Sequence, residues 1–137
     1  VLQYLAAAGV GKLGIADGDI VEISNLQRQV LYNETELGKN KAQVAKEKIT
    51  KLNSTIELEV YDFFIDTLSI FKIITDYDVV VDCTDHFSIR YLLNDVCFLH
   101  NKPLVFASIY QFEAQLSVFH YGEKPYNSRD VFSEIPY

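Results

Sequence analysis

Three consecutive valines, Val79 to Val81, most constrain what this chain can fold into, because they form an unbroken β-branched run between Asp78 and Asp82. Such a run, bounded by polar residues, is typical of a strand that is buried on both faces in a parallel sheet. A parallel sheet needs helical crossovers, which cover its faces. The segment 78–83 therefore predicts an α/β fold in which strands alternate with helices.

Apolar residues recur at helical or strand spacing along the rest of the chain. Helices are predicted over residues 1–8, 39–52, 66–75 and 85–101. Further strands are predicted over residues 12–17, 55–60, 104–107 and 112–118, the last of them antiparallel. Asp66 is expected to cap the third helix, and Thr84 or Asp85 the fourth. The apolar side chains of the fourth helix expected to face the core are Ile89, Leu92, Leu93, Val96, Cys97 and Leu99.

The 137 residues are expected to form a single domain, 1–137, and 12 basic against 19 acidic side chains give a formal charge of −7. This charge disfavours a nucleic acid or an anionic membrane as partner. No apolar run is long enough to span a membrane, and no signal sequence opens the chain. Cys83 and Cys97 lack metal-ligand or disulfide-framework spacing, which fits a cytoplasmic protein. Because Val1 begins inside a predicted helix without a cap, we expect the chain to be incomplete at the N-terminus.

An acidic residue, Asp17, ends the first predicted strand. In a nucleotide-binding βαβ unit, an acid at this position accepts hydrogen bonds from ribose hydroxyls. The alternative is a polar residue that only ends a strand. A glycine-rich phosphate loop is not found before the first helix, since Gly9, Gly11 and Gly14 follow that helix.

Amide and hydroxyl side chains surround one arginine in the loop that follows, Ser24-Asn25-Leu26-Gln27-Arg28-Gln29. The guanidinium is a planar fork that suits phosphate oxygens, and amides can bind phosphate without adding charge. The loop is therefore either a phosphate site or an ordinary solvated loop.

A lysine, Lys41, lies near the start of the second predicted helix, where the helix dipole favours an anion. The apolar face of this helix excludes Lys41. It is therefore expected to be either a phosphate ligand or one more surface lysine among Lys39, Lys46 and Lys48.

The valine strand runs into the turn Asp82-Cys83-Thr84-Asp85-His86. Ligands of open α/β sheets bind at the carboxyl ends of strands, so this turn is a candidate site. Asp85 is either a helix N-cap or a magnesium ligand that faces a polyphosphate. Cys83 is expected to be a small buried filler, and none of His86, His100 and His120 has metal-ligand spacing with a cysteine.

These motifs follow one another in a known order, and the chain resembles the ThiF/MoeB/HesA family, the bacterial relatives of ubiquitin-activating enzymes. The resemblance runs from Val1 to about Tyr121. Its motifs are Tyr4-Leu5-Ala6-Ala7-Ala8-Gly9-Val10-Gly11, Asp17-Gly18-Asp19, Ser24-Asn25-Leu26-Gln27-Arg28-Gln29, Gly38-Lys39-Asn40-Lys41, Asp82-Cys83-Thr84-Asp85 and Lys102-Pro103-Leu104-Val105.

The resemblance implies a Rossmann-like domain, truncated here, that uses ATP and magnesium. The implied reaction adenylates the C-terminal glycine of a ubiquitin-like sulfur-carrier protein, similar to ThiS or MoaD, and the implied assembly is a homodimer. Arg28, Lys41 and Asp85 are the implied catalytic residues, with Asp85 on magnesium. The implied nucleotide-binding residues are Asp17 on the ribose, then Ser24, Asn25, Leu26, Gln27, Arg28, Lys41, Asp85 and His86.

Many family members carry a zinc-binding cysteine pair after the antiparallel strand, but segment 124–132 has no cysteine, so no zinc is predicted there. Two alternatives to the adenylyltransferase remain. An NAD-dependent dehydrogenase would use Asp17 but would not need Arg28 and Lys41 beside a magnesium-binding Asp85. A non-catalytic interaction subunit would be expected to lose Arg28 or Asp85. The sequence does not choose between thiamine and molybdopterin pathways.

Overall fold

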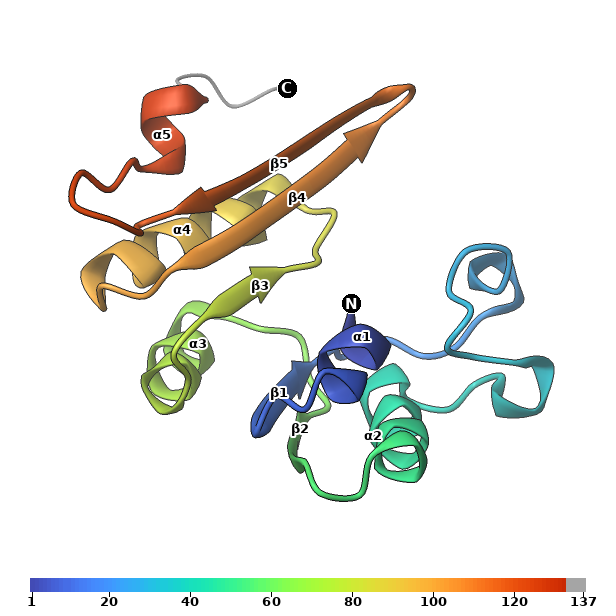
Figure 1. Ribbon diagram of the computed structural model, residues 1–137. Coiled ribbons are helices and arrows are strands. Elements are labelled where there is room, and N and C mark those ends of the chain that lie inside the picture. The colour runs from blue at the N-terminus through green and yellow to red at the C-terminus, as the bar shows by residue number, and fades with distance from the viewer. Residues whose placement is uncertain (133–137) are drawn as a thin grey trace. The chain divides into compact units, whose positions relative to one another are not determined.

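Strands and helices alternate along the chain in the computed structural model, which describes residues 1–132 (Figure 1). The contacts divide the chain into two units, Val1–Ile65 and Asp66–Tyr137, each with its own small sheet. The predicted α/β class is confirmed. No helix within residues 1–132 is long and apolar enough to cross a membrane.

The first unit places two helices on a parallel pair of strands. Its elements are α1 (Leu2–Ala7), β1 (Lys12–Ala16), the 3-10 turns η1 (Ile23–Asn25) and η2 (Glu34–Glu36), α2 (Lys41–Leu52) and β2 (Glu57–Tyr61). In β1 and β2, Leu13 lies opposite Leu58. Leu13 also packs with Ala6 of α1 and Ile49 of α2, so the helices and the sheet share one core.

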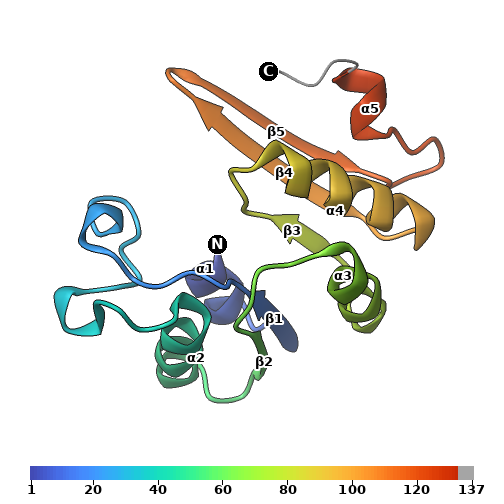
Figure 2. The same ribbon diagram turned by 180° about the vertical axis from the view of Figure 1, so that it is seen from behind.

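The second unit carries a mixed sheet in the order β3-β4-β5. Its elements are α3 (Thr67–Ile73), η3 (Ile74–Asp76), β3 (Val80–Asp82), α4 (Phe87–Leu99), β4 (Leu104–Tyr110), β5 (Glu113–Phe119) and α5 (Ser128–Val131). β3 is parallel to β4, whereas β5 is antiparallel to it, as the sequence predicts for the last strand. Helix α4 lies across one face of the β4–β5 ribbon (Figure 2).

Two predicted helix starts have different outcomes. Asp66 caps α3 as expected, since its Oδ1 accepts from the backbone N–H of Ser69 at 2.7 Å. The predicted cap of α4 is wrong: the N-cap residue is His86, and it makes no side-chain cap hydrogen bond. The hydroxyl of Thr84 instead donates to Asp82 Oδ1 at 2.7 Å, and Asp85 points into solvent.

Several burial predictions for the second unit are also wrong. Leu99 is 63% exposed, because the buried face of α4 includes Asn94 and ends at Cys97. Cys83 is exposed rather than a buried filler, and Val81 of the valine strand is 37% exposed. The described part of the segment after Tyr121 contains the short helix α5.

Candidate functional site

Lys41 is buried, although the sequence predicted a lysine excluded from the apolar face of its helix. Its side chain is 6% exposed, and its Nζ lies 2.5 Å from Asp19 Oδ2. A buried ammonium needs a counter-charge, and Asp19, which residue spacing had not singled out, supplies it. The same ammonium holds the pKa of the Asp19 carboxyl below its usual range. The surface-lysine alternative is therefore wrong.

Backbone bonds tie the start of α2 to the loop that follows β1. The N–H of Lys41 donates to the carbonyl of Asp19 at 2.9 Å. Asn40 caps α2 by accepting from Gln43 N–H at 3.0 Å. The Asn40 amide then donates to the carbonyls of Asp17, at 3.1 Å, and of Asp19, at 3.3 Å. The expected ribose-binding acid and the expected phosphate-binding lysine are thus fixed by one short network.

The carboxylate of Asp17 accepts from the N–H of Asp19 at 3.0 Å, which turns the chain sharply after β1. Gly18 lets the backbone of Phe64 lie directly against this turn, because a Cβ there would be 2.4 Å from the backbone nitrogen of Phe64. Contacts this short do not occur for real side chains, so a larger residue would displace the loop that carries Asp17 and Asp19. Aspartate-glycine-aspartate is a signal that sequence reasoning could have used for Asp19.

The polar loop around Arg28 contains buried acceptors that no described residue satisfies. Asn25 is 8% exposed, and neither its Oδ1 nor the Oε1 of Gln29 has a hydrogen-bond partner among residues 1–132. Buried acceptors are normally paired, so an unpaired one suits a position that a ligand or water completes. Arg28 is exposed, and within the described part of the chain its side chain bonds only to the carbonyl of Ser24, at 3.2 Å. Leu26 is half-buried and Gln27 is exposed.

In the second unit, the turn after β3 is braced from two sides. Asp82 is 1% exposed, and its Oδ1 accepts from the backbone N–H of Thr84 at 2.8 Å. Arg90 donates from Nη2 to the carbonyl of Thr84 at 2.6 Å, and its guanidinium lies 5.0 Å from the centre of the Phe106 ring. Asp82 and Arg90, two residues that sequence reasoning did not choose as functional, thus fix the backbone on either side of the turn.

Among the described residues, the side chain of Asp85 has an ion-pair contact only with its neighbour His86. Its side chain is 94% exposed, and Oδ1 lies 3.8 Å from His86 Nε2. The N-cap alternative is therefore wrong, and the carboxylate is available to a hard cation. Within residues 1–132 no group of three or more His, Cys, Asp or Glu side chains could hold a metal ion by itself. Magnesium often binds through one or two carboxylates together with substrate phosphates and water, and Asp85 fits that mode.

The segment without cysteines is held by polar contacts that we call the α5 clasp: Asn94, Asp95, Asn127, Arg129 and Asp130. Arg129 forms a two-point ion pair with Asp95, at 2.9 and 2.6 Å. Buried Asn94 donates to Asn127 Oδ1 at 3.0 Å, and Asn127 and Asp130 cap α5 reciprocally. The clasp therefore joins α5 to α4 through hydrogen bonds and one ion pair.

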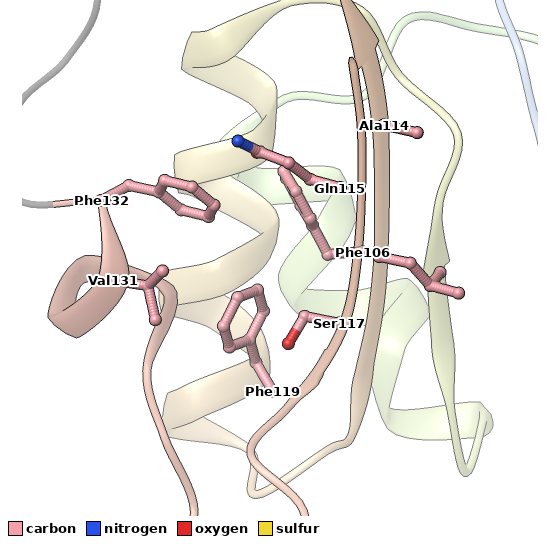
Figure 3. A pocket seen from close by; sticks show the side chains of 8 residues that line it. Phe106, Ala114, Gln115, Ser117, Phe119, Val131 and Phe132 are labelled. Carbon is pink, nitrogen blue, oxygen red and sulfur yellow. The ribbon is translucent and has the colours of Figure 1, made fainter.

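A hollow of about 400 Å³ opens beside β5. None of the catalytic or nucleotide-binding residues predicted from the sequence lines it. Figure 3 shows Phe106, Phe119 and Phe132 together in it, with Val131 of α5 nearby. The centres of the Phe106 and Phe132 rings are 5.6 Å apart, so α5 packs on the sheet through these aromatic side chains.

The model of the ThiF family matches residues 1–136. This chain belongs to the ThiF family. Among its relatives, the sulfur carrier protein adenylyltransferase of Thermus thermophilus is 48% identical over 88% of the chain and 45% of the relative. A probable molybdopterin-synthase adenylyltransferase of Porphyra purpurea is 44% identical over 98% of the chain and 35% of the relative. The chain thus spans less than half the length of these two ThiF-family proteins.

Solved structures of E. coli MccB have the same fold. MccB with MccA-N7isoASN matches with a TM-score of 0.77 at 33% identity, over 85% of this chain and 35% of MccB. MccB with ATP matches with a TM-score of 0.71 at 34% identity, over 77% of this chain and 32% of MccB. The predicted Rossmann-like α/β class and the predicted family are therefore confirmed.

Proposed function

We propose that the full-length protein is an ATP-dependent adenylyltransferase that activates the C-terminal glycine carboxylate of a ubiquitin-like sulfur-carrier protein. The observation that carries this proposal is the network that ties the acid Asp17, after β1, to the buried cation Lys41, at the start of α2, in a ThiF-family chain. Relatives named as adenylyltransferases of a sulfur carrier protein and of molybdopterin synthase support the substrate class. Thiamine and molybdopterin carriers are both candidates, and a homodimer is the proposed assembly.

The reaction has an electrostatic problem that the proposed residues address. The carrier carboxylate attacks the α-phosphorus of ATP, an acyl adenylate forms, and pyrophosphate leaves, so two anions approach and charge builds on the leaving group. Arg28 and Lys41 would offset this charge on the phosphates. The carboxylate is already ionised at neutral pH, so the step needs no general base.

The other proposed contacts orient the nucleotide. Asp17 would accept hydrogen bonds from the ribose, as acids at the end of a nucleotide-binding strand do. Asn25 would donate from its amide N–H group to the phosphates, together with its neighbours Ser24, Leu26 and Gln27 in the loop. Asp85 would hold magnesium, with His86 beside the nucleotide. The bound magnesium would supply positive charge to the phosphates; no zinc is proposed for segment 124–132.

Exchange of labelled pyrophosphate into ATP tests the reaction directly. We expect the full-length protein with magnesium to catalyse this exchange only when a ThiS-like or MoaD-like carrier with its terminal glycine is present. A carrier without that glycine is the matched control. A protein that shows no exchange with any carrier, and is protected from proteolysis by NAD instead of ATP with magnesium, would be a dehydrogenase-type binder. Protection by ATP without exchange would indicate the non-catalytic alternative.

A further inference from the structure

The contact that buries Lys41 points to a positioning residue for the proposed reaction. Asp19 binds Lys41 twice: its carbonyl accepts the backbone N–H at 2.9 Å, and its Oδ2 lies 2.5 Å from the ammonium. We propose that Asp19 is the residue that aims the Lys41 ammonium at the phosphates. This inference rests on the proposed function and adds a residue to it.

The carboxylate of Asp19 is itself fixed, so it can hold a second group in place. Its Oδ1 accepts from the N–H of Ile20 at 2.8 Å, and its backbone N–H donates to Asp17 Oδ1 at 3.0 Å. A lysine side chain has four carbon–carbon bonds that can rotate, and an anchor at the ammonium removes most of that freedom. Lys41 therefore keeps one orientation before any ligand binds, and such preorganisation lowers the cost of binding.

The ammonium of Lys41 keeps donors that Asp19 does not use. The side chain of Lys41 is 6% exposed, whereas that of Asp19 is 47% exposed. The lysine is therefore almost closed to solvent, while its partner carboxylate is partly open. An ammonium has three donors, and within residues 1–132 its one hydrogen-bond acceptor is Asp19, which leaves donors for phosphate oxygens.

Asp19 could also serve only to link the loop to α2, with the same distances. The test must therefore separate this structural role from the proposed positioning of Lys41. Asp19→Asn keeps an acceptor for Ile20 but removes the charge opposite Lys41. Glu36→Gln is the matched control, because Glu36 Oε2 lies 2.7 Å from Nζ of Lys48 on the same helix. Both changes remove one carboxylate charge from an ion pair with α2.

The first measurement is pyrophosphate exchange in a double-mutant cycle of the full-length protein. We expect Asp19→Asn to lower kcat/KM for ATP by roughly tenfold to a hundredfold, the range of a small misplacement of a reacting group. In a Lys41→Ala background the same change should add almost nothing, because Asp19 acts through Lys41. Glu36→Gln should leave kcat/KM within about twofold. The assignment would be overturned if the losses of kcat/KM in Asp19→Asn and Lys41→Ala multiply in the double variant. Equal losses of kcat/KM in Asp19→Asn and Glu36→Gln would also overturn it.

The second measurement does not depend on adenylation. Competitive acetylation with acetic anhydride, followed by mass spectrometry, reports how accessible each lysine is. Lys41 should label several times faster in Asp19→Asn than in the unaltered protein, while exposed Lys39 and Lys46 should not change. Unchanged labelling of Lys41 would overturn the proposal. A protein that fails to adenylate any carrier but shows the labelling change would overturn the proposed function and leave the role of Asp19 in holding Lys41.

Discussion

The two units present their charged candidate residues in opposite ways. In the first unit Lys41 is 5% exposed, ion-paired and hydrogen-bonded through its backbone. In the second unit the side chain of Asp85 is 94% exposed and caps no helix, although Asp82 and Arg90 brace the turn around it. The cation is therefore preorganised by the fold, whereas the carboxylate has only its backbone fixed. Substitutions of Lys41 should change stability and activity together, and those of Asp85 should separate them.

Lys41→Met should have the largest combined effect. It removes the proposed phosphate-binding charge and leaves Asp19 beside a buried methionine, so we expect exchange activity to fall at least about a hundredfold. The loss of a partly buried ion pair should lower the free energy of unfolding by about 1–3 kcal/mol. Exchange assays and urea unfolding of the full-length protein measure the two effects.

Lys48→Met on the same helix is the control for that prediction, since Lys48 pairs with Glu36 at 2.7 Å and is not a proposed ligand. It should lower stability without an equal loss of activity. If Lys41→Met unfolds the protein no more easily than the unaltered chain does, burial of Lys41 has no energetic importance and the contrast between the units fails.

Asp85→Asn should reduce exchange by orders of magnitude, because an amide lacks the charge with which Asp85 is proposed to hold magnesium. Thermal melting should be almost unchanged, because Asp85 makes no cap hydrogen bond that could be lost. Asp85→Ala should melt at the same temperature as Asp85→Asn for the same reason. If Asp85→Asn retains exchange activity, Asp85 is not needed for the reaction. If Asp85→Ala alone melts at a lower temperature, the side chain has a structural role that an amide can replace.

Arg28→Ala should also abolish exchange while it leaves stability nearly unchanged. Arg28 lies in the first unit but is exposed, and its side chain donates to the carbonyl of Ser24 at 3.2 Å. Its loss creates no cavity, in contrast to the loss of a buried side chain. Exchange at a near-normal rate would overturn the assignment of Arg28 to a phosphate site. A large loss of stability would show that exposed Arg28 supports the fold as buried Lys41 does, so that burial does not explain the difference between them.

Element order and fold class could be predicted from the sequence because periodicity is a local property. The cap at Asp66 is an example: its partner Ser69 is three residues away and visible in the sequence. The predicted cap at Thr84 or Asp85 is wrong because other nearby bonds win: the Thr84 hydroxyl bonds Asp82, and Arg90 of α4 donates to the Thr84 carbonyl. Which acceptor a turn uses depends on such contacts, and spacing alone does not reveal them.

The burial of the site residues and their contact partners were harder to predict than their identity. Lys41 was expected at the surface because helical periodicity counts only apolar neighbours, and the partner that buries it is 22 residues away. Asn94 was missed for the same reason, because its partner Asn127 is 33 residues away. Polar residues with long-range partners are thus the ones whose burial the sequence does not show.

The smallest expected effect concerns the α5 clasp, which is the second unit's counterpart of the Asp19–Lys41 pair. Arg129 holds the pKa of Asp95 below its usual range, as Lys41 does for Asp19. The Arg129–Asp95 pair is about half exposed on both sides, at 49% and 45%, so solvent screens it. We expect Arg129→Gln to lower the urea midpoint at neutral pH slightly, by less than Lys41→Met does, and to leave exchange activity intact.

The pH dependence of the difference in urea midpoint between the unaltered protein and Arg129→Gln shows whether the charge of Arg129 causes it. Because the pKa of Asp95 is lower in the folded than in the unfolded state, the ion pair stabilises the fold fully at neutral pH. That contribution is lost as the pH falls through the folded-state pKa of Asp95. The gap between the midpoints of the unaltered protein and Arg129→Gln should therefore narrow as the pH falls below the usual pKa of an aspartate. A gap that is the same at neutral and acid pH would mean that Arg129 acts by packing on the Tyr91 ring, 4.8 Å from its guanidinium carbon, and not by its charge.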